Sequence, residues 1–390
     1  MLKLCSNIEA LDVPLVTGDT LENVGVVAKV FKDLCPRIQE LSVELIHFDH
    51  HGLNILPIME EIEPHTLQRW SMGWYSDSWK SRTLEVIQRH SETMREIRFP
   101  RTYSFKSSTI QGILTTCRAL EHLGIGGDLA VRLKLWLDDI EPNTTWVSTR
   151  LRYLKLTVDW NDKQDKLNPP KPKQEPTVCM SLGLINDKMN AILASRMRLG
   201  IPSEQAKPDG HEELAGVMAR EANERRRTRL ILFYKQLGNL TNLEVLDLRG
   251  TSGFPEEEPS NELRPYTEYA LPRLLSLADD DEATTAPREQ GRTKQERRGK
   301  KVGYLSELGG LAKLRELRGS FRIDRHIVKT YMGQREVEFM HQRWPELRLI
   351  ELLPPDYETR EGFVVPSHIR WFMEQRPFTK MAIPLPPAAR

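Results

Sequence analysis

The sequence has few cysteines, no long apolar run and almost no excess of charge of either sign. Four cysteines in 390 residues are too few for a disulfide framework. No apolar run approaches the ~18 residues that a membrane-spanning helix needs. Glu9 and Asp12 also fall where a signal peptide would be apolar. We therefore expect an intracellular protein that has no membrane partner. Its expected location is the cytoplasm, and import into the nucleus is the alternative.

The charge balance argues against nucleic acid as a partner. Lys and Arg number 56 against 55 Asp and Glu, which leaves a formal net charge of +1. A balance this close supplies no overall attraction to a phosphate backbone. Two basic runs, 225–229 and 297–301, stand out locally. Either they are nuclear localisation signals, or the first is paired with nearby glutamates on a helix and the second is solvated.

Signatures of catalysis are also missing. No Gly-x-Ser-x-Gly, His-Glu-x-x-His or protein-kinase signature occurs. Gly124 to Asp128 follows an expected strand but lacks the Lys-Ser/Thr of a phosphate-binding loop, so we interpret it as a tight turn. His47 to His51 is rich in metal-ligating types, but no cysteine lies near, and we interpret it as a solvated turn. We predict no enzyme activity, no cofactor and no metal.

Leucine, by contrast, accounts for 50 of the 390 residues, and the pattern apolar-x-x-apolar-x-apolar recurs in nine segments. Six of the eight steps between successive segments lie between 26 and 33 residues. The final apolar-x-apolar alternation is typical of a short strand with one buried face. Gly319 replaces the last apolar residue of the eighth segment. The segments begin at Ile8, Ile38, Leu67, Met94, Leu120, Leu151, Leu243, Leu314 and Leu347.

The stretches between these segments read as helices. Start signals occur at residues 19–22, 107–109 and 127–128, and stop signals at Pro142 and Pro345. The second half of residues 211–237 is apolar and predicts a packed helix, and so does the spacing of Leu129, Leu133 and Leu137. Strand followed by helix, about every 29 residues, requires a parallel sheet with helices on one side.

Two phrases, residues 4–13 and 34–43, share the form Leu-Cys-x-x-Ile-x-x-Leu-x-Val. Residues 237–248 read Leu-Gly-Asn-Leu-Thr-Asn-Leu-Glu-Val-Leu-Asp-Leu. These phrases resemble the leucine-rich repeat of the ribonuclease-inhibitor-like, cysteine-containing type, over roughly residues 1–160, 230–252 and 304–355. The resemblance implies an α/β leucine-rich-repeat solenoid: a curved parallel sheet, helices on its convex side, irregular, about nine repeats. Cys5, Cys35 and Cys117 take one repeat position, which predicts buried structural thiols.

Repeats of this type are familiar from the substrate-binding half of F-box proteins, including fungal F-box-like proteins, which are receptors of cullin-type ubiquitin ligases. The resemblance therefore implies a non-catalytic protein–protein interaction scaffold that recognises substrates for an SCF-type ligase. We find no F-box before Ile8, so we expect a ligase adaptor as partner only if an F-box lies upstream. The alternative is a stand-alone leucine-rich-repeat adaptor with no ubiquitin link, and the remote alternative is an enzyme.

Two long steps in the repeat mark insertions. Tyr266, Tyr269, Leu271, Leu274 and Leu275 are expected to pack back on the repeats, and Ser367 to Met373 to form a capping helix. We predict N-terminal repeats at 1–160, a Pro/Lys-rich and irregular insertion at 161–210, a charged helix plus a repeat at 211–251, a largely disordered acidic-then-basic insertion at 252–303, C-terminal repeats at 304–355, and a cap and tail at 356–390.

Side chains that flank the central apolar residue of each strand form the concave face of the predicted solenoid. A wide, preformed surface suits an extended protein better than a small molecule, which needs a concave pocket. We therefore predict a protein or peptide target, bound by charge and by Tyr153; a solvated face without a partner is the alternative. The predicted partner-binding residues are Glu40, Glu44, Arg69, Glu96, Arg98, His122, Tyr153, Lys155, Asp247, Arg249 and Arg318.

Overall fold

The computed structural model describes residues 7–15, 29, 32–33, 35–45, 56–72, 82–99, 107–124, 133–159, 224–225, 227–250, 275, 277, 303–319, 332–353, 357–359 and 362–382. The predictions for residues 19–22, 47–51 and 125–128, for Cys5, and for almost all of both insertions lie outside this part. The chain divides into two units, residues 1–160 with 230–390, and residues 161–229. The first unit contains every strand of the described part.

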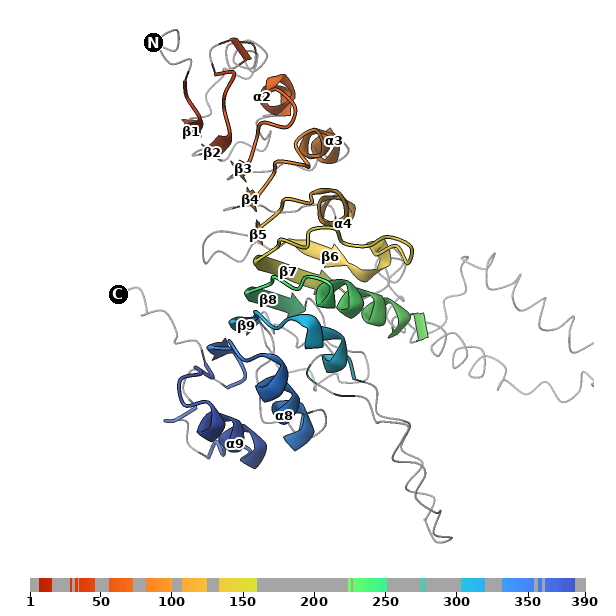
Figure 1. Cartoon of the computed structure of the whole chain (residues 1–390), viewed down its shortest axis with the longest axis vertical. Helices are drawn as coiled ribbons and strands as arrows, with labels where there is room; N and C mark the ends of the chain where they lie inside the picture. Colours follow the sequence, from red (N-terminus) through yellow and green to blue (C-terminus); the bar gives the residue numbers. More distant parts are fainter. Residues whose placement is uncertain are drawn as a thin grey trace, which may run out of the picture. The chain divides into compact units, whose positions relative to one another are not determined.

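Ten parallel strands form one open sheet, which confirms the predicted α/β class with a parallel sheet. The order is β1-β2-β3-β4-β5-β7-β8-β9-β10, and β6 pairs with β7 off this path. The strands are β1 (Ala10–Leu15), β2 (Glu40–Leu45), β3 (Arg69–Met72), β4 (Glu96–Arg98), β5 (His122–Gly124), β6 (Lys134–Trp136), β7 (Tyr153–Asp159), β8 (Val245–Gly250), β9 (Glu316–Gly319) and β10 (Leu349–Ile350). Figure 1 shows β1 to β5 and β7 to β9 in succession, with β6 beside β7.

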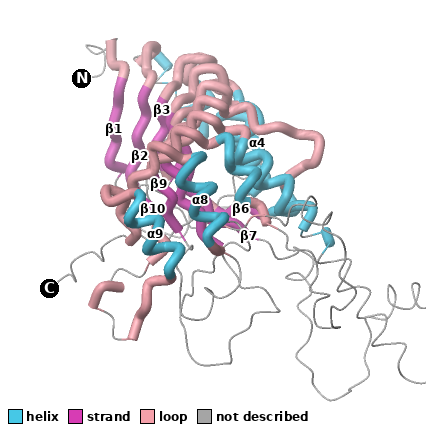
Figure 2. Tube along the Cα trace, turned by 60° about the horizontal axis from the view of Figure 1, so that its bottom comes forward, coloured by secondary structure: helices cyan, strands magenta, loops and turns pink. Residues whose placement is uncertain are grey.

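The helices alternate with the strands along the chain, and α2, α3 and α4 lie on the same side of the sheet (Figure 1). Figure 2 shows β1, β2 and β3 side by side, with α4 away from them on one side. The helices are α2 (Leu56–Glu61), α3 (Arg82–Gln88), α4 (Ser107–Thr116), α8 (Gln334–Arg343) and α9 (Ser367–Gln375), with the 3-10 helices η4 (Leu137–Asp139) and η9 (Leu305–Gly310). Residues 230–238, before β8, are also helical.

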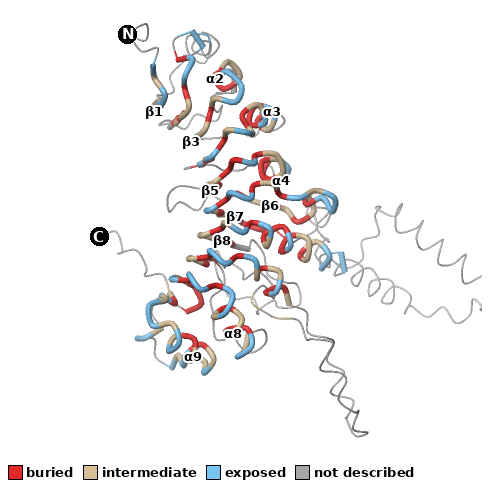
Figure 3. The backbone as a smooth tube through the Cα atoms, in the orientation of Figure 1, coloured by how far each residue is buried: buried red, intermediate tan, exposed pale blue. Residues whose placement is uncertain are grey.

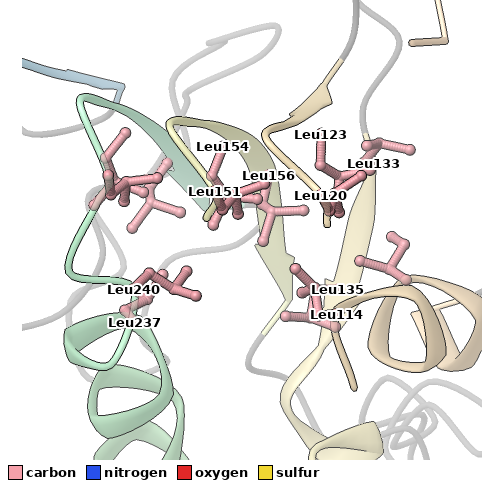
Figure 4. Close-up of a cluster of buried hydrophobic side chains, with 14 of the residues drawn as sticks. Leu114, Leu120, Leu123, Leu133, Leu135, Leu151, Leu154, Leu156, Leu237 and Leu240 are labelled. Atoms are coloured by element: carbon pink, nitrogen blue, oxygen red, sulfur yellow. The ribbon is translucent and has the colours of Figure 1, made fainter. Parts of the chain in front are cut away.

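A row of apolar side chains crosses the sheet because every strand on the main path contributes its central apolar residue in register. Leu154, for example, pairs with Leu123 on one side and Leu246 on the other. Buried segments recur through strands and helices alike (Figure 3), and leucines from both close the core between them (Figure 4). Each fully buried leucine contributes about 1.5–3 kcal/mol. The row is Leu11, Leu41, Trp70, Ile97, Leu123, Leu154, Leu246, Leu317 and Ile350.

One backbone contact fixes this register. The carbonyl of Glu121 accepts hydrogen bonds from the N–H groups of Arg152 (2.8 Å) and Tyr153 (3.1 Å), where β7 begins. The same two-donor contact joins the starts of all nine strands on the main path. The Glu244 N–H donates to the Arg152 carbonyl at 2.8 Å, although the longer insertion separates the two residues in sequence. The insertion therefore leaves the sheet uninterrupted.

A buried polar cluster ties the segments on the two sides of that insertion. Gln111 accepts a hydrogen bond from the indole Nε1–H of Trp146 at 2.8 Å. Gln236 accepts one from the Trp146 backbone N–H at 2.9 Å and donates to the Thr144 carbonyl at 2.5 Å. The two glutamine side chains satisfy groups that burial would otherwise leave without partners. They hold α4, the 141–150 loop and helical residues 230–238 together.

The C-terminal segment pairs with the last strand. The N–H of Lys380 donates to the Arg348 carbonyl, and the Ile350 N–H donates to the Lys380 carbonyl, both at 2.8 Å. Helix α9 begins at Ser367, as the sequence predicts, and contacts α8. Its side chains Ile369 and Phe372 are buried. The edge of the sheet at β10 is therefore covered by the chain itself.

Several other helix predictions are confirmed, and one is wrong. Helix α4 begins at Ser107, and α8 ends just before Trp344 and Pro345. The helix expected through Leu137 is absent over the described residues, where β6 (Lys134–Trp136) and η4 occur instead. Leu133, Leu135 and Leu137 are all buried and alternate with half-exposed residues. The same leucines match both periods, and the period of two is the one that buries them.

Gly319, the exception in the sequence pattern, has a steric reason. Its φ of +119° lies in a region that side chains with a Cβ rarely adopt. A Cβ on Gly319 would stand 1.7 Å from the carbonyl oxygen of Leu248. The carboxylate of Glu351 accepts a hydrogen bond from the Gly319 N–H at 2.9 Å. The backbones of β8 and β9 approach here as only glycine permits.

Gly319→Ala should lower the free energy of unfolding by roughly 2 kcal/mol or more, because both the dihedral angle and the contact with Leu248 become unfavourable. Urea unfolding followed by circular dichroism measures the change. Gly333→Ala is the matched control, since a Cβ there would meet its nearest atom at an ordinary 3.5 Å. Equal losses in the two variants would contradict the steric explanation.

His90 makes stability depend on pH. It is fully buried, its Nδ1 accepts a 3.4 Å hydrogen bond from the Leu67 N–H, and burial lowers its pKa to about 4, with a further contribution from Arg89. A folded-state pKa below the unfolded value means that the contribution is complete above pH ~6.5. It is lost as the pH falls from there toward 4, at about 1.4 kcal/mol per pH unit and at most about 3 kcal/mol in total.

His90→Asn keeps an acceptor for Leu67 but does not titrate, so its stability should change less between pH 7 and pH 5 than that of the wild type, by about 2 kcal/mol. Urea unfolding at the two pH values gives both differences. A pH dependence that is the same in the two proteins would assign the titration to other groups.

Candidate functional site

The candidate site is the face of the sheet that carries the outward side chains of the strands, here called the open face. Its first row is Ala10, Glu40, Arg69, Glu96, His122, Tyr153, Val245, Glu316 and Leu349, and its second row is Asp12, Ser42, Ser71, Arg98, Gly124, Lys155, Asp247, Arg318 and Glu351. These positions alternate with the buried apolar row, because successive side chains of a strand point to opposite faces.

Nine of the eleven predicted partner-binding residues have described side chains, and all nine lie in these two rows. The other two, Glu44 in β2 and Arg249 in β8, have side chains outside the described part. The sheet thus brings together residues up to 278 positions apart in sequence, from Glu40 to Arg318. Their role in binding a partner stays a prediction.

Ion pairs occupy the part of the open face on β2 to β4. Arg69 lies 2.8 Å from Glu40 and 3.5 Å from Glu96, between two carboxylates on neighbouring strands. Glu96 also pairs with the Nε of Arg98 on its own strand. Exposed pairs of this kind add little to stability, about 0–1 kcal/mol each. Their main effect is to hold long side chains in place on the surface.

A second group of charges lies on β7 to β9. The ammonium of Lys155 is 3.6 Å from the carboxylate of Asp247, which is almost fully buried. Arg318 pairs with Glu316 on its own strand. Most charges of the open face therefore have an opposite charge beside them, so the face has no strong charge of one sign.

Between the two charged groups lies an uncharged aromatic centre. The rings of His122 and Tyr153 stack with centroids 4.2 Å apart and planes at 1°. The Tyr153 ring rests against Gly124, where a Cβ would stand only 2.6 Å from the Tyr153 Cε1. Gly124 thus permits the position of the ring. The sequence pattern placed Gly124 in a turn; glycine within a strand signals such a close approach.

Burial beside Tyr153 affects the titration of His122. Desolvation lowers the pKa of His122, Glu96 raises it and Arg98 lowers it further. The neutral imidazole is therefore favoured at the centre of the open face at neutral pH. A neutral ring stacks on tyrosine without the desolvation cost of a buried cation.

A ladder of polar side chains at the strand starts, which was not expected from the sequence, borders the open face. Glu244 accepts hydrogen bonds from Arg152 at 2.6 Å and from Arg315 at 3.1 Å, and Arg315 continues to Glu346 at 2.9 Å. The hydrogen bond from Arg152 lowers the pKa of Glu244. The signal in the sequence was the polar residue immediately before β7, β8 and β9, whereas Glu346 lies three residues before β10.

Metal-binding clusters and thiols are two kinds of reactive group to consider among the described residues. None of their His, Cys, Asp and Glu side chains form a group of three or more that could hold a metal ion. Cys35 and Cys117 are buried free thiols, as predicted, and burial raises the pKa of Cys117 to about 11. A thiol that is protonated at neutral pH is a poor nucleophile.

Among the described residues, no helix has both the length and the apolar character to cross a membrane.

Comparison with known proteins gives no relative: no family model matches the chain, and no curated protein or solved structure matches it significantly.

Removing the Tyr153 ring should raise the pKa of His122 toward the usual ~6.5, because the imidazole becomes better solvated. The expected result for Tyr153→Ala is an upward shift of the His122 titration, read by NMR of ¹³C-labelled histidine. Tyr357→Ala, far along the chain, is the control and should leave the titration unchanged. An unchanged His122 pKa in Tyr153→Ala would show that the stack does not desolvate His122.

Proposed function

We propose that the protein is a non-catalytic scaffold whose open face binds a polypeptide. The observation that carries this proposal is the arrangement of that face: an uncharged aromatic centre, His122 and Tyr153, between two sets of paired charges. Protein interfaces have this anatomy, in which aromatic residues near the centre supply most of the binding energy and a polar rim excludes water.

We also propose that the sheet is the inner layer of a leucine-rich-repeat solenoid of about nine units. Support comes from the central apolar residue of each strand, which keeps one register across the sheet, and from the two-donor backbone contact that recurs at the strand starts. The buried thiols of Cys35 and Cys117 fit a repeat position occupied by a small apolar group. A solenoid makes the open face wide enough for an extended partner.

The specific form of the function that we propose is substrate recognition for a ubiquitin ligase, on the resemblance of the sequence to the repeat half of F-box proteins. Proximity labelling of the full-length protein in its own cells tests it. Recovery of cullin and adaptor subunits is the expected result. Their absence beside other reproducible partners would favour the stand-alone adaptor.

The binding role of the open face has its own test. The variant Ser71→Arg with Tyr153→Ala adds bulk to one strand of the face and removes the aromatic centre. A purified partner from the labelling experiment should bind it at least ~10-fold more weakly than the wild type, which corresponds to ~1.4 kcal/mol. Biolayer interferometry measures the affinities.

The matched control is Ser91→Arg with Tyr357→Ala, which makes the same two changes away from the open face. Its affinity should stay within about twofold of the wild type. Equal binding by both variants would place the partner elsewhere on the protein.

A further inference from the structure

Two cations beside the aromatic centre of the open face have N–H donors that no described residue uses. Arg98 and Lys155 lie on either side of Gly124 in the second row. Arg98 uses its Nε for Glu96, and its two terminal nitrogens have no other partner among the described residues. Lys155 lies 3.6 Å from Asp247, beyond hydrogen-bonding distance, and makes no hydrogen bond within the described part of the chain. The two side chains thus keep several N–H bonds for a ligand.

The charge distribution directs an anion to this place. In the two rows of the open face, the described side chains of β3 to β8 include three cations, Arg69, Arg98 and Lys155, and two carboxylates, Glu96 and Asp247. Outside the two rows, Lys134 on β6 and Asp159 on β7 form a further ion pair that adds no net charge. Carboxylates exceed cations on both sides of that region, with Asp12 and Glu40 on β1 and β2, and with Glu316, Arg318 and Glu351 around β9 and β10. The region from β3 to β8 therefore has a small excess of positive charge around its uncharged aromatic centre, and it lies between two negative flanks.

The surroundings strengthen a charged hydrogen bond at the centre. Gly124 contributes no side chain between Arg98 and Lys155, and the Tyr153 ring lies against it. Aromatic surface beside the two cations keeps part of the solvent away, so their attraction for an anion is screened less than on an open surface. The guanidinium edge of Arg98 also matches a carboxylate in shape, because two parallel N–H bonds point the same way.

We propose that the centre of the open face binds a carboxylate of an acidic polypeptide segment. The terminal nitrogens of Arg98 donate two hydrogen bonds to an Asp or Glu side chain of the segment, and Lys155 donates a third. A neighbouring apolar side chain of the segment lies on the Tyr153 and His122 rings. This inference rests on the proposed function, since it specifies the chemistry of the polypeptide that the scaffold holds.

The negative flanks favour a short acidic motif over a nucleic acid. A phosphate backbone carries charge at every nucleotide and would meet Asp12 and Glu40 on one side and Glu316 on the other. A polypeptide can place its acidic residue at the centre alone, with basic or neutral residues over the flanks. Charge complementarity of this kind selects partners as well as strengthening their binding.

The experiment is selection of random twelve-residue peptides on the immobilised full-length protein. Enriched peptides should share an Asp or Glu next to an apolar residue. The selected peptides are synthesised with a fluorophore, and their affinity is measured by anisotropy. Arg98→Gln with Lys155→Gln should weaken binding at least ~10-fold, as expected for a desolvated charge pair. Changing the peptide carboxylate to its amide should cause the same loss, and the two losses should not add.

The control variant is Arg118→Gln with Lys235→Gln, which removes the same two kinds of charge from exposed positions away from the open face. Its affinity should stay within about twofold, and thermal unfolding verifies that both variants fold. Enriched peptides without a carboxylate, or acidic peptides that bind the Arg98/Lys155 variant unchanged, overturn the inference and leave the scaffold proposal standing. Displacement of the peptide by a single-stranded oligonucleotide at lower concentration than by unlabelled peptide also overturns it. Failure to enrich any peptide counts against the scaffold proposal itself.

Discussion

The structure depends on the register between its parallel strands. At the start of each strand on the main path one carbonyl accepts two backbone N–H groups from the next, as Glu121 does from Arg152 and Tyr153. Because side chains alternate along a strand, a slip of one residue would turn the apolar row outward and the charged rows inward. The same contact that builds the core therefore also assembles the open face, and the site needs no separate scaffolding.

The register between neighbouring strands is also kept across the longer insertion, which separates β7 from β8. Between β7 and β8 the chain leaves the first unit at residue 160 and returns at residue 230. Gln111 and Gln236, which come from opposite sides of this interval, both bond to the segment that holds Trp146. Such paired polar groups are costly to break inside a core, because each leaves the other unsatisfied. The hydrogen bonds of Gln111 and Gln236 thus help to keep β7 and β8 adjacent, although the two strands are far apart in sequence.

The positions of strands and buried residues could be predicted from the periodicity of the sequence. Contacts between side chains on neighbouring strands could not. The strands, the buried leucines and the outward positions could be read from the spacing of apolar residues. The helix expected through Leu137 was wrong because Leu133 and Leu137 satisfy two periods at once, and only the sheet decides between them. The need for glycine at positions 124 and 319 could not be predicted from the local sequence, because the atoms that Gly124 and Gly319 accommodate belong to Tyr153 and Leu248 on neighbouring strands. The pairing of each cation likewise depends on which strands are adjacent.

The open face differs from the core in how a substitution at Gly124, the glycine against which the Tyr153 ring lies, would affect it. Buried positions accept few substitutions, because volume lost or gained there reaches the whole packing. Gly124 instead supports one aromatic ring on the outer side of the sheet, where the nearest group that a new methyl would displace is Tyr153 itself. A single codon can thus reposition the ring and leave the leucines untouched. The surface that the sheet presents can therefore change by substitution without a change in the buried row that holds the strands together.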